Sequence, residues 1–200
     1  MLRYLSTILF ALLIPSGGAP APSLLPDAPV YNAEGSLQLP ANYREWVYLT
    51  SGLDMNYNTA APVAGHSIFD NVFVNPSSYR AFLNTGTWPD KTTFILELRD
   101  ADVHVNIDKR GQSQTSDFRI EIHVKDQTRL PDGWGFYNFG TATTGKLIER
   151  PATCYSCHEG HAAVDTTFVQ FYPTLIGIAK ARKTLSPAYL EDTDFPGPGK

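Results

Sequence analysis

The sequence predicts an α+β protein in which helices flank an antiparallel β-sheet of about five strands. Several segments alternate apolar and polar side chains with a period of two, which is typical of strands that bury one face. Toward the C-terminus, apolar residues recur at helical spacing instead. Because the buried face of the sheet needs a partner, we expect the helices to pack against it.

Two of the expected strands alternate most clearly. In residues 93–99, Phe94, Leu96 and Leu98 form one apolar face, and residues 118–125 show the same pattern. The other strands are expected at 46–50, 69–74 and 134–139. The last of these is apolar on both faces, so we expect it to be central and covered on both sides.

A short helix should separate the second and third strands. Asn75 can cap it, Pro76 suits its first turn, and Gly86 suits its C-terminal end. A further helix is expected from apolar residues that recur in the C-terminal region: Phe168, Phe171, Tyr172, Leu175, Ile176 and Ala179. Pro173 should kink or break this helix.

The string Cys154-Tyr155-Ser156-Cys157-His158 has the spacing C-x-x-C-H and contains the only two cysteines of the chain. This is the attachment signature of a c-type haem, in which two thiols form thioethers and the adjacent histidine faces the iron. We therefore expect one covalently bound haem c, attached through Cys154 and Cys157, with His158 as the axial iron ligand. A C-terminal helix should carry the motif.

Three other uses of the cysteine pair are possible. A thioredoxin-type redox pair follows a strand early in its domain, whereas this motif lies in the last quarter of the chain. A zinc site could add His161 to the motif, but structural zinc sites usually combine two separated ligand pairs. A disulfide would close so small a loop that it would add little stability.

The N-terminus has the order of a secretory signal: Arg3, an apolar stretch over 5–14, and small residues over 16–19. We expect residues 1–21 to be a signal peptide, which predicts a periplasmic or secreted protein. The stretch is too short for a stable membrane span, although an uncleaved anchor is the alternative. The net charge of −4 does not favour nucleic-acid binding.

The rest of the chain is long enough for one domain with its own core. We expect an extended segment over 22–35, a haem domain over 36–185, and a flexible tail over 186–200 that ends in alternating proline and glycine.

The sequence offers few candidates for a sixth iron ligand. Met55, the only methionine besides Met1, lies in a polar loop. His66 precedes a strand and is the only plausible distal histidine. His104 lies in a polar loop, His123 falls on the exposed polar face of its strand, and His161 lies on the proximal side. A simple electron carrier would need Met55 or His66 as the sixth ligand.

Four blocks resemble the cytochrome P460 family in their order and spacing: residues 42–47, 71–79, 85–90 and 132–137. The closest match is the haem motif followed by Asp165-x-x-Phe168-x-x-Phe171-Tyr172-Pro173. The resemblance covers about residues 36–180 and implies a homodimer built on a largely antiparallel sheet.

The resemblance also implies one of two functional types. Cytochrome P460 proper oxidises hydroxylamine, with nitric oxide, and carries a lysine cross-linked to the haem. The cytochrome c′-beta type lacks this cross-link and binds nitric oxide and carbon monoxide at a five-coordinate iron under a phenylalanine-rich cap. Leu96 stands where the cross-linking lysine would be, and the nearest lysine is Lys91. The chain is therefore closer to the c′-beta type.

An open sixth position needs a pocket that sorts ligands by polarity. Our candidates for an apolar distal pocket come from the predicted strands, although each could be ordinary core: Phe69, Phe73, Phe94, Leu96 and Phe136. Acid–base chemistry would need a carboxylate over the haem instead. Glu97 and Asp70 are the nearest such residues, and no catalytic residue is assigned.

These observations predict a periplasmic mono-haem c-type cytochrome with five-coordinate, high-spin iron that binds nitric oxide or carbon monoxide at an apolar pocket. The alternative is a hydroxylamine or nitric oxide oxidoreductase of the cytochrome P460 type, so the question of enzymatic activity stays open. A simple electron-transfer cytochrome is the third hypothesis. The partners would be small gaseous or nitrogen-oxide ligands, an unidentified redox partner, and a second copy of the chain.

Overall fold

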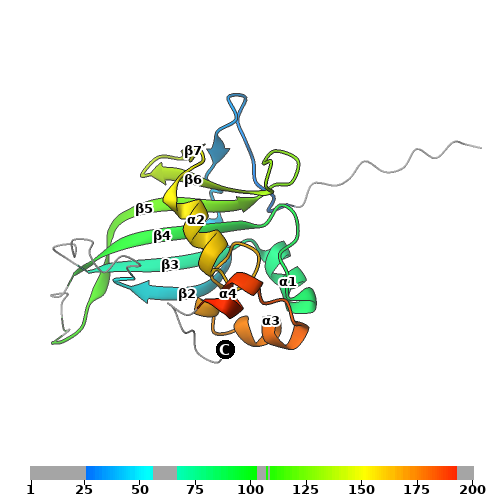
Figure 1. The fold of residues 1–200 in the computed structure, drawn as a ribbon. Helices are drawn as coiled ribbons and strands as arrows, with labels where there is room; N and C mark the ends of the chain where they lie inside the picture. Colours follow the sequence, from blue (N-terminus) through cyan, green and yellow to red (C-terminus); the bar gives the residue numbers. More distant parts are fainter. Residues whose placement is uncertain (1–25, 56–66, 103–106, 108, 193–200) are drawn as a thin grey trace, which may run out of the picture.

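The computed structural model describes residues 26–55, 67–102, 107 and 109–192. It has seven antiparallel strands in the order β1-β7-β6-β5-β4-β3-β2, with helices packed on one side of the sheet (Figure 1). The α+β prediction is confirmed, but the expected number of strands, about five, was too low. The strands are β1 Leu37–Gln38, β2 Val47–Leu53, β3 Ile68–Val74, β4 Thr93–Asp102, β5 Ser113–Lys125, β6 Trp134–Gly140 and β7 Thr144–Leu147. The expected signal peptide, 1–21, lies outside the described residues.

The two strands that sequence analysis missed, β1 and β7, pair with each other at one edge of the sheet. Their lengths are two and four residues, too short to show a period of two. Gly145 of β7 lies against the ring of Phe139, and a Cβ at this position would overlap that ring. This close approach explains why a strand contains glycine at this position. In the sequence alone, a glycine here favours a loop.

The helices are α1 Pro76–Thr85, α2 Thr153–His161, α3 Ile176–Arg182 and α4 Pro187–Glu191, with short 3-10 turns η1 Tyr43–Glu45 and η2 Val169–Phe171. Gly86 ends α1 in the left-handed conformation (φ 74°), as expected. Asn75 makes no side-chain cap. Its Oδ1 instead accepts a hydrogen bond from the Thr93 amide at 2.9 Å, which ties the start of α1 to β4.

The C-terminal region forms three short helical pieces. The predicted helix is broken near Pro173 into η2 and α3. Residues 187–191, where we expected a flexible tail, form α4. The Ser186 side chain accepts a hydrogen bond from the Tyr189 amide as an N-cap, and the Tyr189 side chain is buried. Both contacts fix α4 in place.

The sheet is covered on both faces, whereas the alternating patterns had predicted one buried face. The helices cover the face that carries Phe94. Residues 37–46 cover the other face, where Ile95 and Ile122 pack against Leu37, Tyr43 and Trp46. β6 contributes to both cores, with Trp134 on one face and Tyr137 on the other, as its apolar sequence predicted.

Candidate functional site

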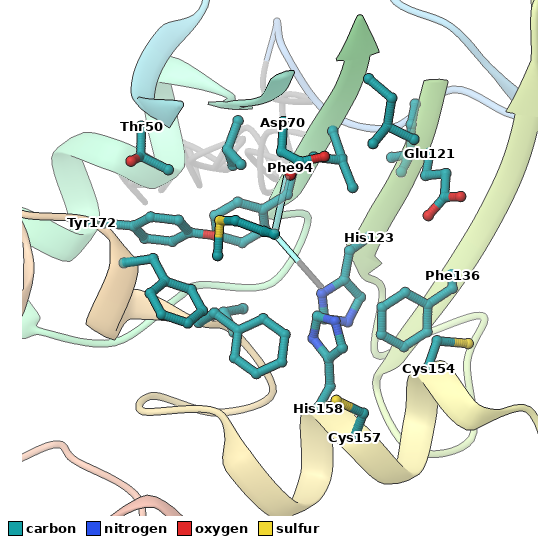
Figure 2. A pocket seen from close by; sticks show the side chains of 18 of the residues that line it. Thr50, Asp70, Phe94, Glu121, His123, Phe136, Cys154, Cys157, His158 and Tyr172 are labelled. Atoms are coloured by element: carbon teal, nitrogen blue, oxygen red, sulfur yellow. The ribbon is translucent and has the colours of Figure 1, made fainter. Parts of the chain in front are cut away.

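A cavity of about 610 Å³ lies between the sheet and α2 (Figure 2). Its volume falls within the range of about 300–1,000 Å³ that is typical of ligand and cofactor sites. Side chains from β3 to β6 form one wall: Asp70, Val72, Phe94, Leu96, Leu98, Glu121, His123 and Phe136. Side chains from α2 and the segment after it form the other: Cys154, Cys157, His158, Thr167, Phe168, Phe171 and Tyr172. Most of this lining is apolar.

Helix α2 presents both thiols of the motif to this cavity. Cys154 and Cys157 are three residues apart, so they lie on the same side of the helix, and both line the cavity. They are free thiols rather than a disulfide. Burial raises the pKa of each thiol above its usual value. Both thiols are therefore free, protonated and exposed to the cavity, so each could form its own bond to a cofactor there.

The imidazole of His158 has a defined orientation. Its Nδ1 lies 2.7 Å from the carbonyl oxygen of Thr166. A carbonyl can only accept, so Nδ1 carries the proton and Nε2 is left with its lone pair. The ring is held between those of Phe136 and Phe168, with centroids 4.7 and 4.2 Å away. Burial lowers the pKa of His158, which favours the neutral form that a metal ligand requires.

His123 also lines the cavity, so its predicted exposure was wrong. Only 8% of the residue is exposed, its ring stacks on Phe136 at 4.0 Å, and its centroid lies 5.1 Å from that of His158. Burial, then the nearby His158, lowers the pKa of His123 well below its usual value. The alternation of β5 was read correctly, but its polar face is the one that α2 covers. This could have been found only from the pairing of His123 with Phe94 on β4.

Three of the five candidates for the distal pocket line the cavity: Phe94, Leu96 and Phe136. Phe69 and Phe73 were assigned to the wrong face. Phe73 pairs with Ile95, and its ring packs against Tyr43 at 5.9 Å on the opposite side of the sheet. Phe69 shares the parity of Phe73, so the β3 residues that face the cavity are the even-numbered ones.

Two carboxyl groups lie in this apolar lining. Asp70 stands beside Leu98 across the β3–β4 pair, and Glu121 stands beside Leu96 across the β4–β5 pair. Burial raises the pKa of both. Glu121 was not among the predicted candidates because the polar face of β5 was expected to face solvent.

Glu97, the other predicted carboxylate, lies on the opposite face. It accepts hydrogen bonds from Tyr43 and Arg99, and Arg44 Nη2 lies 2.8 Å from its Oε2. Only 1% of the residue is exposed. Because these partners occupy both oxygens, Glu97 takes no part in the cavity.

The remaining candidate ligands are distributed as follows. Met55, just after β2, lines the cavity. His161 is bonded through Nδ1 to Asp192 at 2.6 Å and does not belong to the lining. His66 and His104 lie outside the described residues. Lys91 is bonded to Asp126 and Thr128, and none of the described residues that line the cavity is a lysine.

The described part of the chain contains no group of three or more His, Cys, Asp or Glu side chains that could hold a metal ion. No helix in the described ranges is long and apolar enough to cross a membrane.

Comparison with known proteins gives one result. The family model Cytochrome P460 matches residues 40–169, about two thirds of the chain, from just before η1 through the end of the motif helix and into η2. A search of curated proteins found no match.

Proposed function

Because this chain belongs to the cytochrome P460 family of haem-binding cytochromes, we propose that it is a periplasmic mono-haem c-type cytochrome whose five-coordinate iron binds nitric oxide or carbon monoxide. One observation carries this proposal: the two thiols of α2 and the imidazole of His158 lie on the same wall of the cavity. The Nδ1 of that imidazole is hydrogen-bonded, which leaves Nε2 available to ligate a metal. The leader expected over 1–21 supports export, since bacterial c-type haem is attached outside the cytoplasmic membrane.

The residues around the cavity fit a haem. Cys154 and Cys157 would hold it covalently, and His158 would ligate the iron through Nε2, because Thr166 engages the other ring nitrogen. When bound, the haem would supply an iron centre that can bind a diatomic ligand. The chain's own contribution is to fix the imidazole, to exclude water, and to set the polarity of the opposite wall.

The apolar part of that wall favours nitric oxide and carbon monoxide over oxygen. Phe94 and Leu96 face the cavity from β4, and their side chains offer a bound ligand no hydrogen-bond donor. Oxygen gains more from such a donor than the other two gases do. The absence of lysine from the described lining argues against a cross-linked haem. Both features correspond to the c′-beta type of the family.

A second candidate function is favoured by the carboxyl groups of Asp70 and Glu121. Each lies in the lining, and burial raises the pKa of each above its usual value, so either is a candidate to exchange a proton with a nitrogen-containing substrate. This arrangement is what a hydroxylamine or nitric oxide oxidoreductase would need. The two candidates differ in whether the haem carries a third covalent link.

The optical spectrum of the purified ferrous protein, before and after addition of carbon monoxide, tests the first proposal. A broad high-spin spectrum that changes with carbon monoxide supports an open iron site. Sharp low-spin bands that do not respond would contradict it, and Met55→Leu would then show whether Met55, which lines the cavity, fills the sixth position. Mass analysis of the tryptic haem-peptide distinguishes the candidates, because a lysine-linked peptide would favour the oxidoreductase.

A further inference from the structure

A four-residue bend, Val164–Thr167, stands directly behind the imidazole of His158. Val164 and Thr167 exchange backbone hydrogen bonds of 2.9 and 3.3 Å across it, and Asp165 within it has a positive φ of 51°. The bend turns the Thr166 carbonyl toward His158 Nδ1, 2.7 Å away. The direction of that carbonyl therefore depends on how firmly the bend is held.

Trp88, which is distant in sequence, holds the bend by a buried hydrogen-bond relay. Its Nε1–H donates to Thr167 Oγ1 at 2.8 Å, and that hydroxyl donates in turn to the Val164 carbonyl at 2.8 Å. Trp88 and Thr167 are each only 2% exposed. With water excluded, breaking either bond would leave a buried polar group unpaired, so the relay should be rigid.

The indole is itself fixed from α1 and the sheet. Its ring packs against Phe82 of α1 at 4.1 Å and edge-on against Phe94 of β4 at 4.8 Å. Lys125 adds a second tie, since its Nζ donates to the Trp88 carbonyl at 2.7 Å and lies 3.2 Å from the Asp165 carboxylate. The bend is thus attached to the rigid body of the fold at two points.

We propose that Trp88 is a positioning residue for the iron ligand: through Thr167 it holds the Thr166 carbonyl against His158 and so sets how strongly the imidazole donates to the metal. This inference rests on the proposed function, in which His158 ligates the haem iron. A carbonyl that accepts from Nδ1–H raises the basicity of Nε2, and outer partners of this kind tune metal sites. Loosening the relay should weaken the donation from the imidazole to the iron. A weaker donor stabilises the ferric state less, so the reduction potential should rise.

The test uses the full haem-loaded protein and two readouts besides activity: the Fe–N(His) stretching band of the ferrous protein and the midpoint reduction potential. Trp88→Phe keeps a ring against Phe82 but removes the N–H, and Thr167→Val removes the hydroxyl at constant shape. Both should shift the stretching band to lower wavenumber and raise the potential. Thr167→Ser, which restores the hydroxyl, should return both values toward the wild type.

Matched controls come from the opposite face of the sheet. Trp46→Phe changes a buried tryptophan of the other core. Thr93→Val removes a buried hydroxyl that has no hydrogen-bond partner in the described structure. Neither control should move the band or the potential, even if thermal stability falls.

The outcomes separate the two proposals. A wild-type ferrous protein without an Fe–N(His) band would overturn a five-coordinate iron with His158 as its axial ligand, which is the proposed function on which this inference rests. A normal wild-type band that neither Trp88→Phe nor Thr167→Val shifts would overturn the inference alone. If Trp88→Phe does not fold, the two Thr167 variants decide. A shift of the band and the potential in Thr167→Val that Thr167→Ser does not show supports the relay, and equal values in the two variants contradict it.

Discussion

The two faces of the sheet use the same strands for different purposes. On the face covered by residues 37–46, side chains form a packed core, and the buried carboxylate of Glu97 accepts hydrogen bonds from Tyr43 and Arg99. On the face covered by α2, the lining leaves about 610 Å³ and includes carboxyl groups with raised pKa values. Close packing and paired charge provide stability, whereas incomplete packing leaves room for a cofactor.

The largest effect is expected from the motif cysteines, because in the proposed function they attach the haem, and both line the cavity rather than either packed core. Replacing Cys154 and Cys157 with alanine should abolish covalent haem, measured by haem staining after denaturing electrophoresis, while circular dichroism keeps the signal of the sheet. Ser156→Ala, an exposed position between them, is the control and should retain haem. Unfolding of the double variant would show that the two thiols also support the fold, which contradicts this expectation.

The next largest effect should fall on the other face. Ile95 is 0% exposed in the core beneath residues 37–46 and does not line the cavity. Ile95→Ala should lower the free energy of unfolding by about 2–5 kcal/mol, measured by denaturant titration, because it creates a cavity. Haem content should stay unchanged. The matched control is Leu190→Ala at a position 51% exposed, and a similar loss there would show that burial is not the cause.

A smaller, pH-dependent effect is expected from Glu97. Burial by itself raises the pKa of Glu97, but the hydrogen bonds from Arg99 and Tyr43 and the two arginine charges outweigh it, so the net pKa is lowered. Its contribution to stability is therefore complete above the unfolded-state pKa of about 4.3 and is lost as the pH falls below that value.

Glu97→Gln should accordingly lower the free energy of unfolding by about 1–3 kcal/mol at pH 7, and the difference from wild type should shrink in acid. Denaturant titrations at several pH values measure this difference. Glu45→Gln, at an exposed position, should show neither effect. A difference that stays constant down to pH 3 would mean that the charge of Glu97 is not what stabilises this face.

The smallest effect compares two phenylalanines on opposite faces. Phe94→Leu and Phe73→Leu should each lower the free energy of unfolding by about 1 kcal/mol. Only Phe94 lines the cavity, so only its replacement should change the rate of carbon monoxide rebinding after flash photolysis. Equal rates for the two variants would show that the apolar wall of β4 does not contact the ligand.

Sequence reasoning was reliable for local structure. The five longer strands were expected, two of them from clear alternation, and α1 was found from Pro76 and Gly86, because these signals depend on neighbours in the chain. It failed for β1 and β7, whose short pairing at the sheet edge depends on a distant partner. It also failed for Asn75, whose side chain bonds to β4 rather than to its own helix.

The same division applies to the site. The motif Cys154–His158 is a local pattern, and its spacing alone placed both thiols and the imidazole on one helix. Alternation likewise separated the residues of β4 and β5 into two sets. It could not say which set faces α2, since both faces are buried. For that reason His123 was expected in solvent, Phe73 was expected in the cavity, and Glu121 was not considered.

The chain by itself therefore determined the five longer strands, the first helix and the C-x-x-C-H motif, because periodicity and spacing act between residues close in sequence. Packing determined which face of each strand meets α2, how His158 is oriented by Thr166, and how Trp88 reaches Thr167 across 79 positions. These contacts join segments whose separation leaves no trace in local composition. They arise only when sheet, bend and helix close on one another and exclude water from the groups between them.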